Sequence, residues 1–336
     1  MAETSGTDAA PAARAAAGSV DAEEVVVDAL VIGGGPAGLS AALNLGRARA
    51  SVLLADAGRP RNAATLRSHG FLTRDGVPPI ELRKLGLAEL AQYPDVQVAE
   101  RTPVSSLVTV TDASDGIRFR ATLAGRRGDA PALVAARSVL VATGLRETLP
   151  AIPSIRAYYG MTIFSCAACD GWELRDRPLA LIGESADLAT RALLISRWTD
   201  ELTVFTNGAP VIDDVEETQL AARGIRVDRR LIDDLEGERG TVSAMRLADG
   251  GRVPIAGGFV RPTWHPSLEF LTGLAPEVDA DGHLVTDASG RTSIAGVYAA
   301  GDTASPGPQQ LIVAAGAGAR VAAVLTHDLL GVTTAH

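Results

Sequence analysis

Short apolar runs that end at a turn-forming residue recur along the chain, and segments suited to helices follow them. The first run, Ala29–Ile32, leads into a glycine-rich turn and then into Ala37–Leu43, whose small residues suit a helix packed closely on a sheet. Ser51–Ala55, Ser138–Ala142 and Val297–Ala300 also read as buried strands. A strand, tight turn and helix in this order indicate an α/β fold with parallel sheets.

A second strand, turn and helix unit begins at Leu179–Ile182 and Gly183, between the strands of the first unit. The sequence therefore predicts two Rossmann-like, doubly wound, parallel-sheet domains, one inserted in the other. We expect a disordered tail at 1–26, a nucleotide-binding domain in two parts, and an inserted domain that carries both cysteines. The boundaries are expected where prolines interrupt the pattern, which gives 27–150 and 260–332 for the first domain and 151–259 for the insert.

Composition narrows the class of protein. An apolar fraction of 46%, 35 glycines and 4% aromatics fit an α/β enzyme, and a net charge of -9 argues against nucleic acid as a partner. The first 26 residues lack a basic start followed by an apolar core, so no secretory signal is expected. The most apolar window, Leu311–Leu325, is split by Arg320 and reads as a buried helix. We therefore expect a cytoplasmic protein that does not enter a membrane.

The first turn matches the dinucleotide fingerprint G-x-G-x-x-G. Its glycines, Gly33, Gly35 and Gly38, would let the backbone approach a pyrophosphate at a helix N-terminus. Asp56 follows the next strand, eighteen positions after Gly38, where a ribose-binding acid is expected. The alternative is a glycine turn that serves only close packing.

The only two cysteines are Cys166 and Cys169, in Ser-Cys-Ala-Ala-Cys-Asp-Gly. A thiolate so near its partner resolves a mixed disulfide intramolecularly, so the pair is suited to moving two electrons. The alternatives are a structural disulfide, half of a zinc site, or two inert thiols. A structural bridge here would remove little chain entropy, and none of the five histidines has a paired spacing near the cysteines, so no metal is predicted. Asp170 is either a proton-transfer group or a helix cap.

Together these motifs resemble those of a known family. The fingerprint, Ala142-Thr143-Gly144, the C-x-x-C with its Asp-Gly, and Ala300-Gly301-Asp302 occur in the order found in low-molecular-weight thioredoxin reductases, from about residue 27 to 330. Arg61-Asn62, His69–Leu72 and Trp172–Pro178 are more similar to the branch that contains gliotoxin- and holomycin-type dithiol oxidases. Those enzymes commonly have another residue pair between the cysteines, and often His in place of Asp170.

The resemblance implies a homodimer with FAD in the first domain. The residues implied for the FAD site are Gly33, Gly35, Pro36, Ala37, Gly38, Asp56, Arg61, Asn62, Thr143, Gly144, Gly301, Asp302 and Gln310. Asp302 would hold the ribityl or pyrophosphate region, and Gln310 would open a helix that points toward the flavin. The family usually has Arg before this glutamine, where the chain has Gln309. By the same resemblance Cys169 would face the flavin, Cys166 would exchange with the substrate, and Asp170 would move protons.

The second glycine turn lacks the features of an NADPH site. In Gly183–Leu188 only the first glycine of the fingerprint is kept, and Glu184 and Asp187 add negative charge. The segment Thr206-Asn207-Gly208 stands where the family has His-Arg-Arg, which binds the 2'-phosphate of NADPH. The loss of two arginine–phosphate contacts, at about 1.5 to 3 kcal/mol each, weakens NADPH binding roughly a hundred- to ten-thousandfold. NADPH binding is therefore doubtful. Arg191 or Arg197 remain as possible substitutes for the lost arginines.

Three functions follow from these observations. The first is a dithiol oxidase, which forms a disulfide in a small-molecule or peptide dithiol through Cys166, Cys169 and FAD, with oxygen as acceptor. The second is an NAD(P)H-dependent reductase of a thioredoxin-like protein, and the third is a non-enzymatic, flavin-bearing redox sensor. For His69, Trp264 and His265 two interpretations stay open, as lining of the substrate cleft or as ordinary loop residues.

Overall fold

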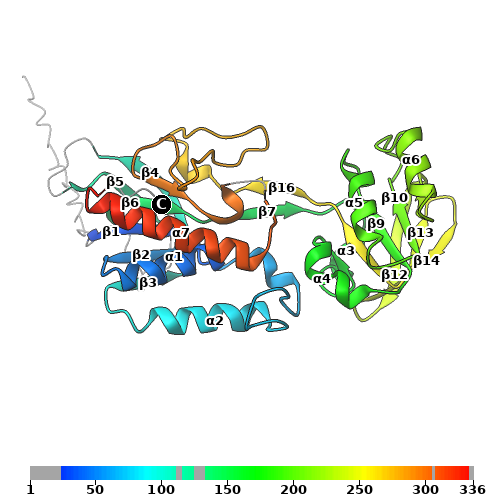
Figure 1. Cartoon of the computed structure of the whole chain (residues 1–336), viewed down its shortest axis with the longest axis horizontal. Helices are drawn as coiled ribbons and strands as arrows, with labels where there is room; N and C mark the ends of the chain where they lie inside the picture. The colour runs from blue at the N-terminus through cyan, green and yellow to red at the C-terminus, as the bar shows by residue number, and fades with distance from the viewer. Residues whose placement is uncertain (1–23, 111–115, 125–132, 305–306, 333–336) are drawn as a thin grey trace, which may run out of the picture.

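The computed structural model describes residues 24–110, 116–124, 133–304 and 307–332. Two lobes follow one another along the longest axis of the molecule, joined by a narrow pair of strands (Figure 1). Each lobe is built on a sheet with parallel strands, and helices pack on these sheets. The predicted α/β class with two Rossmann-type domains is confirmed.

Within the described residues, the first lobe contains a seven-stranded sheet in the order β3-β2-β1-β6-β5-β4, with β17 also paired to β6. β3, β2, β1, β6 and β17 run parallel, whereas β4 and β5 extend the sheet as an antiparallel meander that ends on β6. The strands are β1 (Glu24–Ile32), β2 (Val52–Asp56), β3 (Val96–Glu100), β4 (Val104–Thr109), β5 (Phe119–Leu123), β6 (Leu133–Val141) and β17 (Val297–Ala299).

The first strand begins earlier than the sequence suggested. The tail was expected to reach residue 26, but β1 starts at Glu24, because Val25–Val27 continue the parallel pairing with β6. Val27 is buried in the core beneath this pairing. The remainder of the expected tail, residues 1–23, lies outside the described residues.

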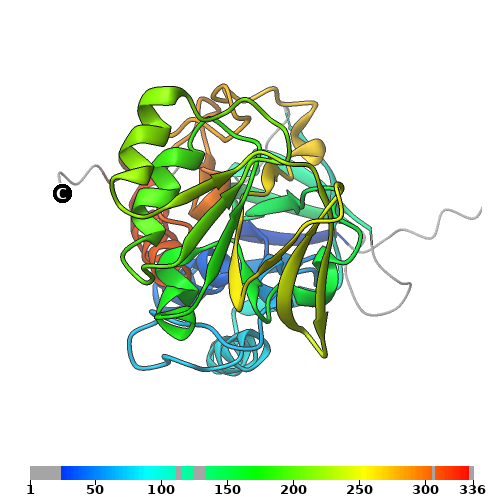
Figure 2. The ribbon, with the colours of Figure 1, turned by 90° about the vertical axis from the view of Figure 1, so that its right-hand side faces the viewer.

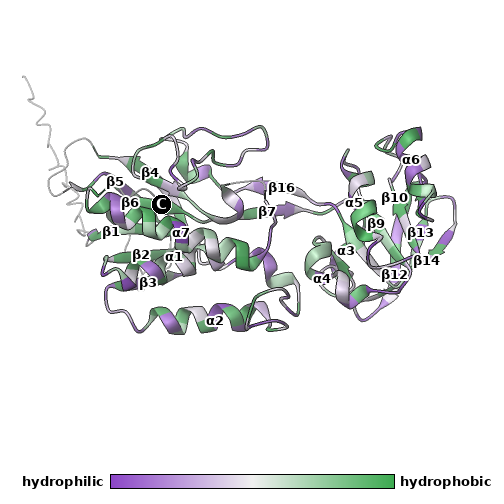
Figure 3. Ribbon diagram, in the orientation of Figure 1, coloured by the Kyte–Doolittle hydropathy of each residue, from purple (hydrophilic) through white to green (hydrophobic). Residues whose placement is uncertain are grey.

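Helices α1 (Pro36–Arg47) and α7 (Leu311–Leu329) pack together in the first lobe, with α2 (Pro79–Leu90) beside α1 (Figure 1). A Cβ atom on Gly318 of α7 would lie 2.0 Å from the carbonyl oxygen of Ala37, so the two backbones touch. By length and composition α7 is apolar enough to cross a membrane, and Figure 3 shows it largely hydrophobic. The helix expected over Leu311–Leu325 is present and buries one face in the core, whereas Ile312 and Val313 on its first turn are exposed.

The second lobe holds a parallel sheet of five strands in the order β11-β10-β9-β15-β8, beside a three-stranded antiparallel sheet. Figure 2 views this lobe from its end. The strands are β8 (Ile163–Phe164), β9 (Leu179–Ile182), β10 (Leu202–Phe205), β11 (Arg226–Asp228), β15 (Gly257–Val260), β12 (Ile232–Glu238), β13 (Thr241–Leu247) and β14 (Arg252–Pro254). The helices are α3 (Ile155–Tyr158), α4 (Ala167–Leu174), α5 (Leu188–Ile195) and α6 (Asp214–Ala221).

The chain crosses between the lobes twice, and both crossings lie in one ribbon. β7 (Leu145–Thr148) leaves the first lobe and β16 (Thr263–Pro266) returns, and the two strands pair antiparallel. Beside this ribbon the lobes come into direct contact, since a Cβ atom on Gly160 would lie 2.0 Å from the carbonyl oxygen of Ala64. Short 3-10 helices, η1 (Arg61–Ala64), η3 (Glu269–Leu271) and η4 (Gly301–Thr303), complete the first lobe.

Candidate active site

A cavity of about 540 Å³ lies at the carboxyl ends of β1, β2, β6 and β17, where ligands bind in open α/β sheets. The structure brings nearly all of the cofactor residues expected from the sequence to its wall. Those that line it are Gly33, Gly35, Pro36, Ala37, Asp56, Arg61, Asn62, Thr143, Gly144, Gly301, Asp302 and Gln310. Gly38 instead lies behind the cavity wall, where an added Cβ atom would lie 1.8 Å from the carbonyl oxygen of Gly33.

The three fingerprint glycines have different structural roles. Gly33 has a φ of 115° and lies against the backbone of Ala142, so a side chain is excluded there. Gly35 is the N-cap of α1, and a Cβ atom on it would meet nothing within 4 Å. Because Gly35 also lines the cavity, that open space is room for a ligand beside the helix N-terminus. The first turn of α1 therefore fits the pyrophosphate of a dinucleotide.

Asp56, the acid expected to bind a ribose, is held by the protein itself. Its side chain accepts hydrogen bonds from the backbone N–H of Gly58 at 3.0 Å and from Nη2 of Arg83 at 2.6 Å. The same Nη2 atom lies 2.9 Å from Glu100 Oε2. Arg83 comes from α2, far from the fingerprint in sequence, and no sequence signal pointed to it.

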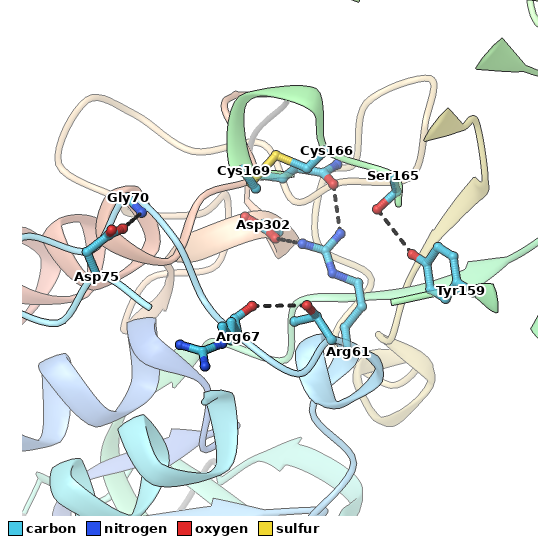
Figure 4. Close-up of a disulfide and its surroundings, with 11 residues drawn as sticks. Arg61, Arg67, Gly70, Asp75, Tyr159, Ser165, Cys166, Cys169 and Asp302 are labelled. Carbon is cyan, nitrogen blue, oxygen red and sulfur yellow. Dashed lines mark hydrogen bonds and ion pairs between the residues drawn. A yellow bond between two sulfur atoms is a disulfide. The ribbon is translucent and has the colours of Figure 1, made fainter. Parts of the chain in front are cut away.

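Arg61 connects three parts of the cavity wall. Its Nη1 atom donates to Oε1 of Gln309 at 2.7 Å. Its Nη2 atom donates to Oδ2 of Asp302 at 2.6 Å (Figure 4). Its guanidinium also lies 4.7 Å from the centre of the Trp264 ring. Burial raises the pKa of Asp302, and the charge of Arg61 opposes that rise. An arginine from η1 thus stands beside the glutamine that replaces the usual family arginine, with Gln310 next to it as the N-cap of α7.

Cys166 and Cys169 form a disulfide, and it lies beside the dinucleotide cavity. Cys166 is the N-cap of α4, and its carbonyl oxygen accepts from the backbone N–H groups of Cys169 and Asp170. The disulfide borders a smaller cavity of about 110 Å³, which shares Arg61, Asn62, Gln309 and Leu311 with the larger one. The shared walls place the redox-active pair next to the space for a dinucleotide.

Asp170 lies in the first turn of α4 and borders the disulfide cavity. Burial, with a further contribution from the charge of Glu173, raises its pKa to about 7. A carboxyl group with this pKa exists in both protonation states near neutral pH. It is therefore suited to accept and return a proton beside the cysteine sulfurs.

The structure also shows a polar group at this cavity that sequence reasoning missed. The hydroxyl of Tyr159 donates to Glu147 Oε2 at 2.7 Å. The same hydroxyl lies 3.1 Å from Ser165 Oγ (Figure 4). Burial raises the pKa of Tyr159, and the hydrogen bond to Glu147 adds to the shift. These three residues come from β7, the turn before β8 and the residue before Cys166, so only the fold assembles them.

The three aromatic and imidazole candidates for the cleft separate in the structure. His69 lines the disulfide cavity and lies between two carboxylates, with Nδ1 3.6 Å from Asp75 Oδ1 and Nε2 3.7 Å from Glu173 Oε1. Trp264 lies against Arg61, and Nε2 of His265 is 3.2 Å from Thr148 Oγ1 within the crossing ribbon. Of these three residues, only His69 lines the cavity beside the disulfide.

The second glycine turn, between β9 and α5, is filled by the protein's own side chains. Asp187, the N-cap of α5, accepts hydrogen bonds from Ser185 Oγ at 2.6 Å and from Arg191 Nε at 2.7 Å. The Nε atom of Arg261 lies 3.1 Å from the same carboxylate. A Cβ atom on Gly183 would lie 2.8 Å from a methyl carbon of Leu188, so the turn is closely packed as well.

The charges of this turn disfavour a phosphate. Burial alone would raise the pKa of Asp187, but hydrogen bonds from Ser185 and Arg191 and the charges of Arg191 and Arg261 hold it below its usual range. Asp187 therefore stays ionised at the helix N-terminus where a pyrophosphate would rest, and Glu184 is held nearby by Asn207 at 2.7 Å. Arg191, one of the two possible substitutes, is committed to Asp187. These residues do not fit NADPH.

Comparisons with known proteins agree with this architecture. The family model for pyridine nucleotide-disulphide oxidoreductases matches residues 27–318. The thioredoxin reductase sirT of Leptosphaeria maculans is 29% identical over 91% of this chain and 95% of its own length. The thioredoxin reductase tcpT of Claviceps purpurea is 29% identical over 82% and 86%. A protein of Arthroderma benhamiae is 34% identical, but over only 54% of this chain and 44% of its own length.

The chain is also similar to solved structures of thioredoxin reductase type. TrxB from Bacillus anthracis has 38% identity and a TM-score of 0.81, over 91% of this chain and 99% of the other. HlmI has 35% identity and a TM-score of 0.83, over 91% and 93%. The resemblance to thioredoxin reductases inferred from the motifs is confirmed at the level of the family.

Proposed function

The chain belongs to the pyridine nucleotide-disulphide oxidoreductase family, and we propose that it is an FAD-dependent dithiol oxidase. Its substrate is a small-molecule or peptide dithiol, which becomes a disulfide while oxygen becomes hydrogen peroxide. The coarser activity, an oxidoreductase acting on sulfur groups, follows from the family and its relatives. What the proposal adds is the direction of electron flow.

The observation that carries the direction is the filled turn between β9 and α5. A reductase of this family draws electrons from a nicotinamide dinucleotide, whose pyrophosphate needs an open helix N-terminus. Here the ionised carboxylate of Asp187 occupies that position and is fixed by Ser185, Arg191 and Arg261. The disulfide beside the dinucleotide cavity then offers the entry for electrons, from a dithiol.

The thiol–disulfide exchange between the substrate and the enzyme takes place in two steps. A substrate thiolate attacks one sulfur of the Cys166–Cys169 disulfide, and the substrate's second thiol then displaces the enzyme from the mixed disulfide. The substrate leaves as a disulfide and the enzyme keeps two thiols, so two electrons have moved to the cysteine pair. By the family resemblance Cys166 is the attacked sulfur. Asp170, with a pKa of about 7, accepts a proton as the substrate thiol ionises and returns it to a cysteine thiolate.

The cavity of about 540 Å³ would hold FAD as the second electron carrier. Gly35 and the N-terminus of α1 would hold the pyrophosphate of FAD, and Asp56 would hold a ribose. Arg61, which is bonded to Asp302, lies in the wall shared with the disulfide cavity. When bound, FAD supplies an acceptor for the electron pair of the cysteines and a donor of two electrons to oxygen.

A second function is supported by the names of the relatives. Several of them are thioredoxin reductases, and the disulfide of this chain lies beside the FAD cavity as that activity requires. In this case a nicotinamide dinucleotide would reduce the enzyme and the cysteine pair would reduce a thioredoxin-like protein. Binding would then have to displace Asp187 from its three partners.

Anaerobic spectroscopy of the purified flavoprotein decides between the two directions. NADPH, NADH and dithiothreitol are added to separate samples while the flavin absorbance is followed. We expect bleaching by dithiothreitol alone, reversal on admitting air, and formation of hydrogen peroxide. The Cys166→Ser variant is the control, because it keeps the FAD cavity and removes the exchange. Fast bleaching by either nicotinamide dinucleotide would contradict the proposal.

A further inference from the structure

A buried hydroxyl group without a partner borders the disulfide cavity. Ser68 is only 4% exposed, and its Oγ atom has no hydrogen-bond partner among the described residues. The same residue lines the cavity of about 110 Å³ together with Cys166 and Cys169. A buried hydroxyl that lacks a partner is costly in free energy, so a group in this position calls for a functional explanation.

The backbone fixes this hydroxyl in place. The N–H of Ser68 donates to the carbonyl oxygen of Val77 at 2.9 Å, and its own carbonyl oxygen accepts from the N–H of Gly76 at 2.8 Å. These bonds form an antiparallel bridge across the loop that precedes α2. Ser68 is therefore anchored on both sides, and its side chain stays at the cavity wall.

The other hydroxyl groups in the wall of this cavity already have hydrogen-bond partners within the protein. Tyr159 donates to Glu147, Ser165 Oγ lies within hydrogen-bond distance of Tyr159, and Thr65 Oγ1 donates to the carbonyl oxygen of Arg67 at 3.0 Å. Ser68 alone, among the hydroxyl-bearing side chains in this cavity wall that the structure describes, keeps its full bonding capacity.

We propose that Ser68 donates a hydrogen bond to an oxygen atom of the dithiol substrate. The inference rests on the proposed function and names the substrate class: dithiols that carry a hydroxyl or carbonyl oxygen within a few bonds of the reacting sulfur. The limit on distance comes from the size of the cavity, which admits only the end of a molecule beside the disulfide. The oxygen that Ser68 reaches therefore belongs to the same end of the substrate as the thiol.

Two dithiols of nearly equal shape test this inference. Dithiothreitol has a hydroxyl group on each inner carbon, whereas 1,4-butanedithiol has none, and both close to the same disulfide ring. Each is mixed anaerobically with the holoprotein, and the rate of flavin bleaching is recorded. Samples quenched with iodoacetamide are analysed by mass spectrometry, which counts reduced Cys166 and Cys169 independently of the flavin.

The preference for dithiothreitol over 1,4-butanedithiol is the measured quantity. In Ser68→Ala we expect this ratio of rate constants to fall about threefold to tenfold, the range for one neutral hydrogen bond. Ser68→Thr keeps a hydroxyl and should retain the preference. Ser165→Ala is the matched control, because it removes a hydroxyl from the same wall that is already bonded to Tyr159, and its ratio should stay at the wild-type value.

Two outcomes would overturn the inference. An unchanged ratio in Ser68→Ala would show that the hydroxyl does not contact the substrate. An equal slowing of both dithiols would show that it acts on the protein's own sulfur instead. Oxygen consumption is measured separately. A wild-type protein that is bleached by dithiols but does not consume oxygen would contradict the proposed function. The comparison of the two dithiols in Ser68→Ala could still be interpreted, because it depends only on the anaerobic step.

Discussion

Arg83 holds the carboxylate of Asp56 through a hydrogen bond of 2.6 Å between Nη2 and Oδ2. The other carboxylate oxygen accepts from the N–H of Gly58. Each oxygen keeps a further lone pair, so the fixed carboxylate can still receive the hydroxyl groups of a ribose. The acid at the end of β2 is thus positioned before any ligand arrives.

Removing this support should weaken FAD binding. In Arg83→Gln we expect the dissociation constant for FAD to rise about tenfold, because Asp56 loses a charge-assisted hydrogen bond and part of its fixed orientation. Recovery of flavin fluorescence on dilution measures the change. Lys84→Gln, at the exposed neighbouring position of α2, is the control and should leave FAD affinity unchanged.

Gly35 offers a test of the pyrophosphate site that separates binding from folding. Its φ of -77° suits any residue, so Gly35→Ala should fold normally while its methyl group fills the open space at the N-terminus of α1. We expect the purified variant to contain little FAD. In Gly316→Ala, on the exposed part of α7, the flavin should be retained and the stability raised by about 0.5 to 1 kcal/mol. A fully flavin-loaded Gly35→Ala would place the pyrophosphate elsewhere.

The raised pKa of Asp170 predicts a pH dependence of stability. Folding raises the pKa from 3.8 to about 7, so the folded state binds the proton more tightly than the unfolded state. The stability from this group is fully present below pH 4 and is lost as pH rises from about 4 to about 7. Asp170→Asn is always neutral, so its melting temperature should lack this decline. Parallel pH profiles for the two proteins would argue against a raised pKa.

Asp170→Asn should also slow the exchange reaction. Without a carboxyl group that titrates near neutral pH, we expect the bleaching rate with dithiothreitol at pH 7 to fall by about a hundredfold. The variant should keep its FAD, because Asp170 borders the disulfide cavity rather than the dinucleotide cavity. A rate equal to that of the wild type would leave Asp170 as a helix residue without a role in proton transfer.

Because the turn between β9 and α5 is filled by side chains, restoring one fingerprint glycine there should not create NADPH binding. In Ser185→Gly the second fingerprint glycine is restored, but Asp187 still accepts from Arg191 and lies beside Arg261. We therefore expect no binding of NADPH at millimolar concentration in isothermal titration calorimetry. Thr199→Ala, a substitution elsewhere in the same lobe, serves as a control for nonspecific effects. Submicromolar binding by Ser185→Gly would show that the hydroxyl alone had closed the site.

Much of the fold could be predicted because its signals are local. The strand over Leu179–Ile182 and the turn at Gly33–Gly35 each depend on a few consecutive residues, and the structure has them where the pattern indicated. The pairing of the two cysteines is local as well. The early start of β1 at Glu24 was missed, because it depends on pairing with β6, more than a hundred residues away.

The parts of the site that sequence reasoning missed are brought together by the fold alone. Arg83, Tyr159 and Ser68 are ordinary surface or loop residues by pattern, and each acquires its place through a partner from another element. Gln309 did carry a signal, since it departs from the family pattern. Arg61 was expected at the FAD site, but its hydrogen bond to Gln309 could not be predicted, because it depends on η1 and the start of α7 lying side by side.

The paired crossings of β7 and β16 form the ribbon through which the chain passes between the lobes. Because both crossings run through one short ribbon, a twist about its axis would leave the hydrogen bonds of both large sheets intact. The contacts that oppose such a twist include the approach of Gly160 to Ala64 and of His69 to Glu173. The ribbon and these contacts together fix the disulfide of the second lobe beside the dinucleotide cavity of the first lobe.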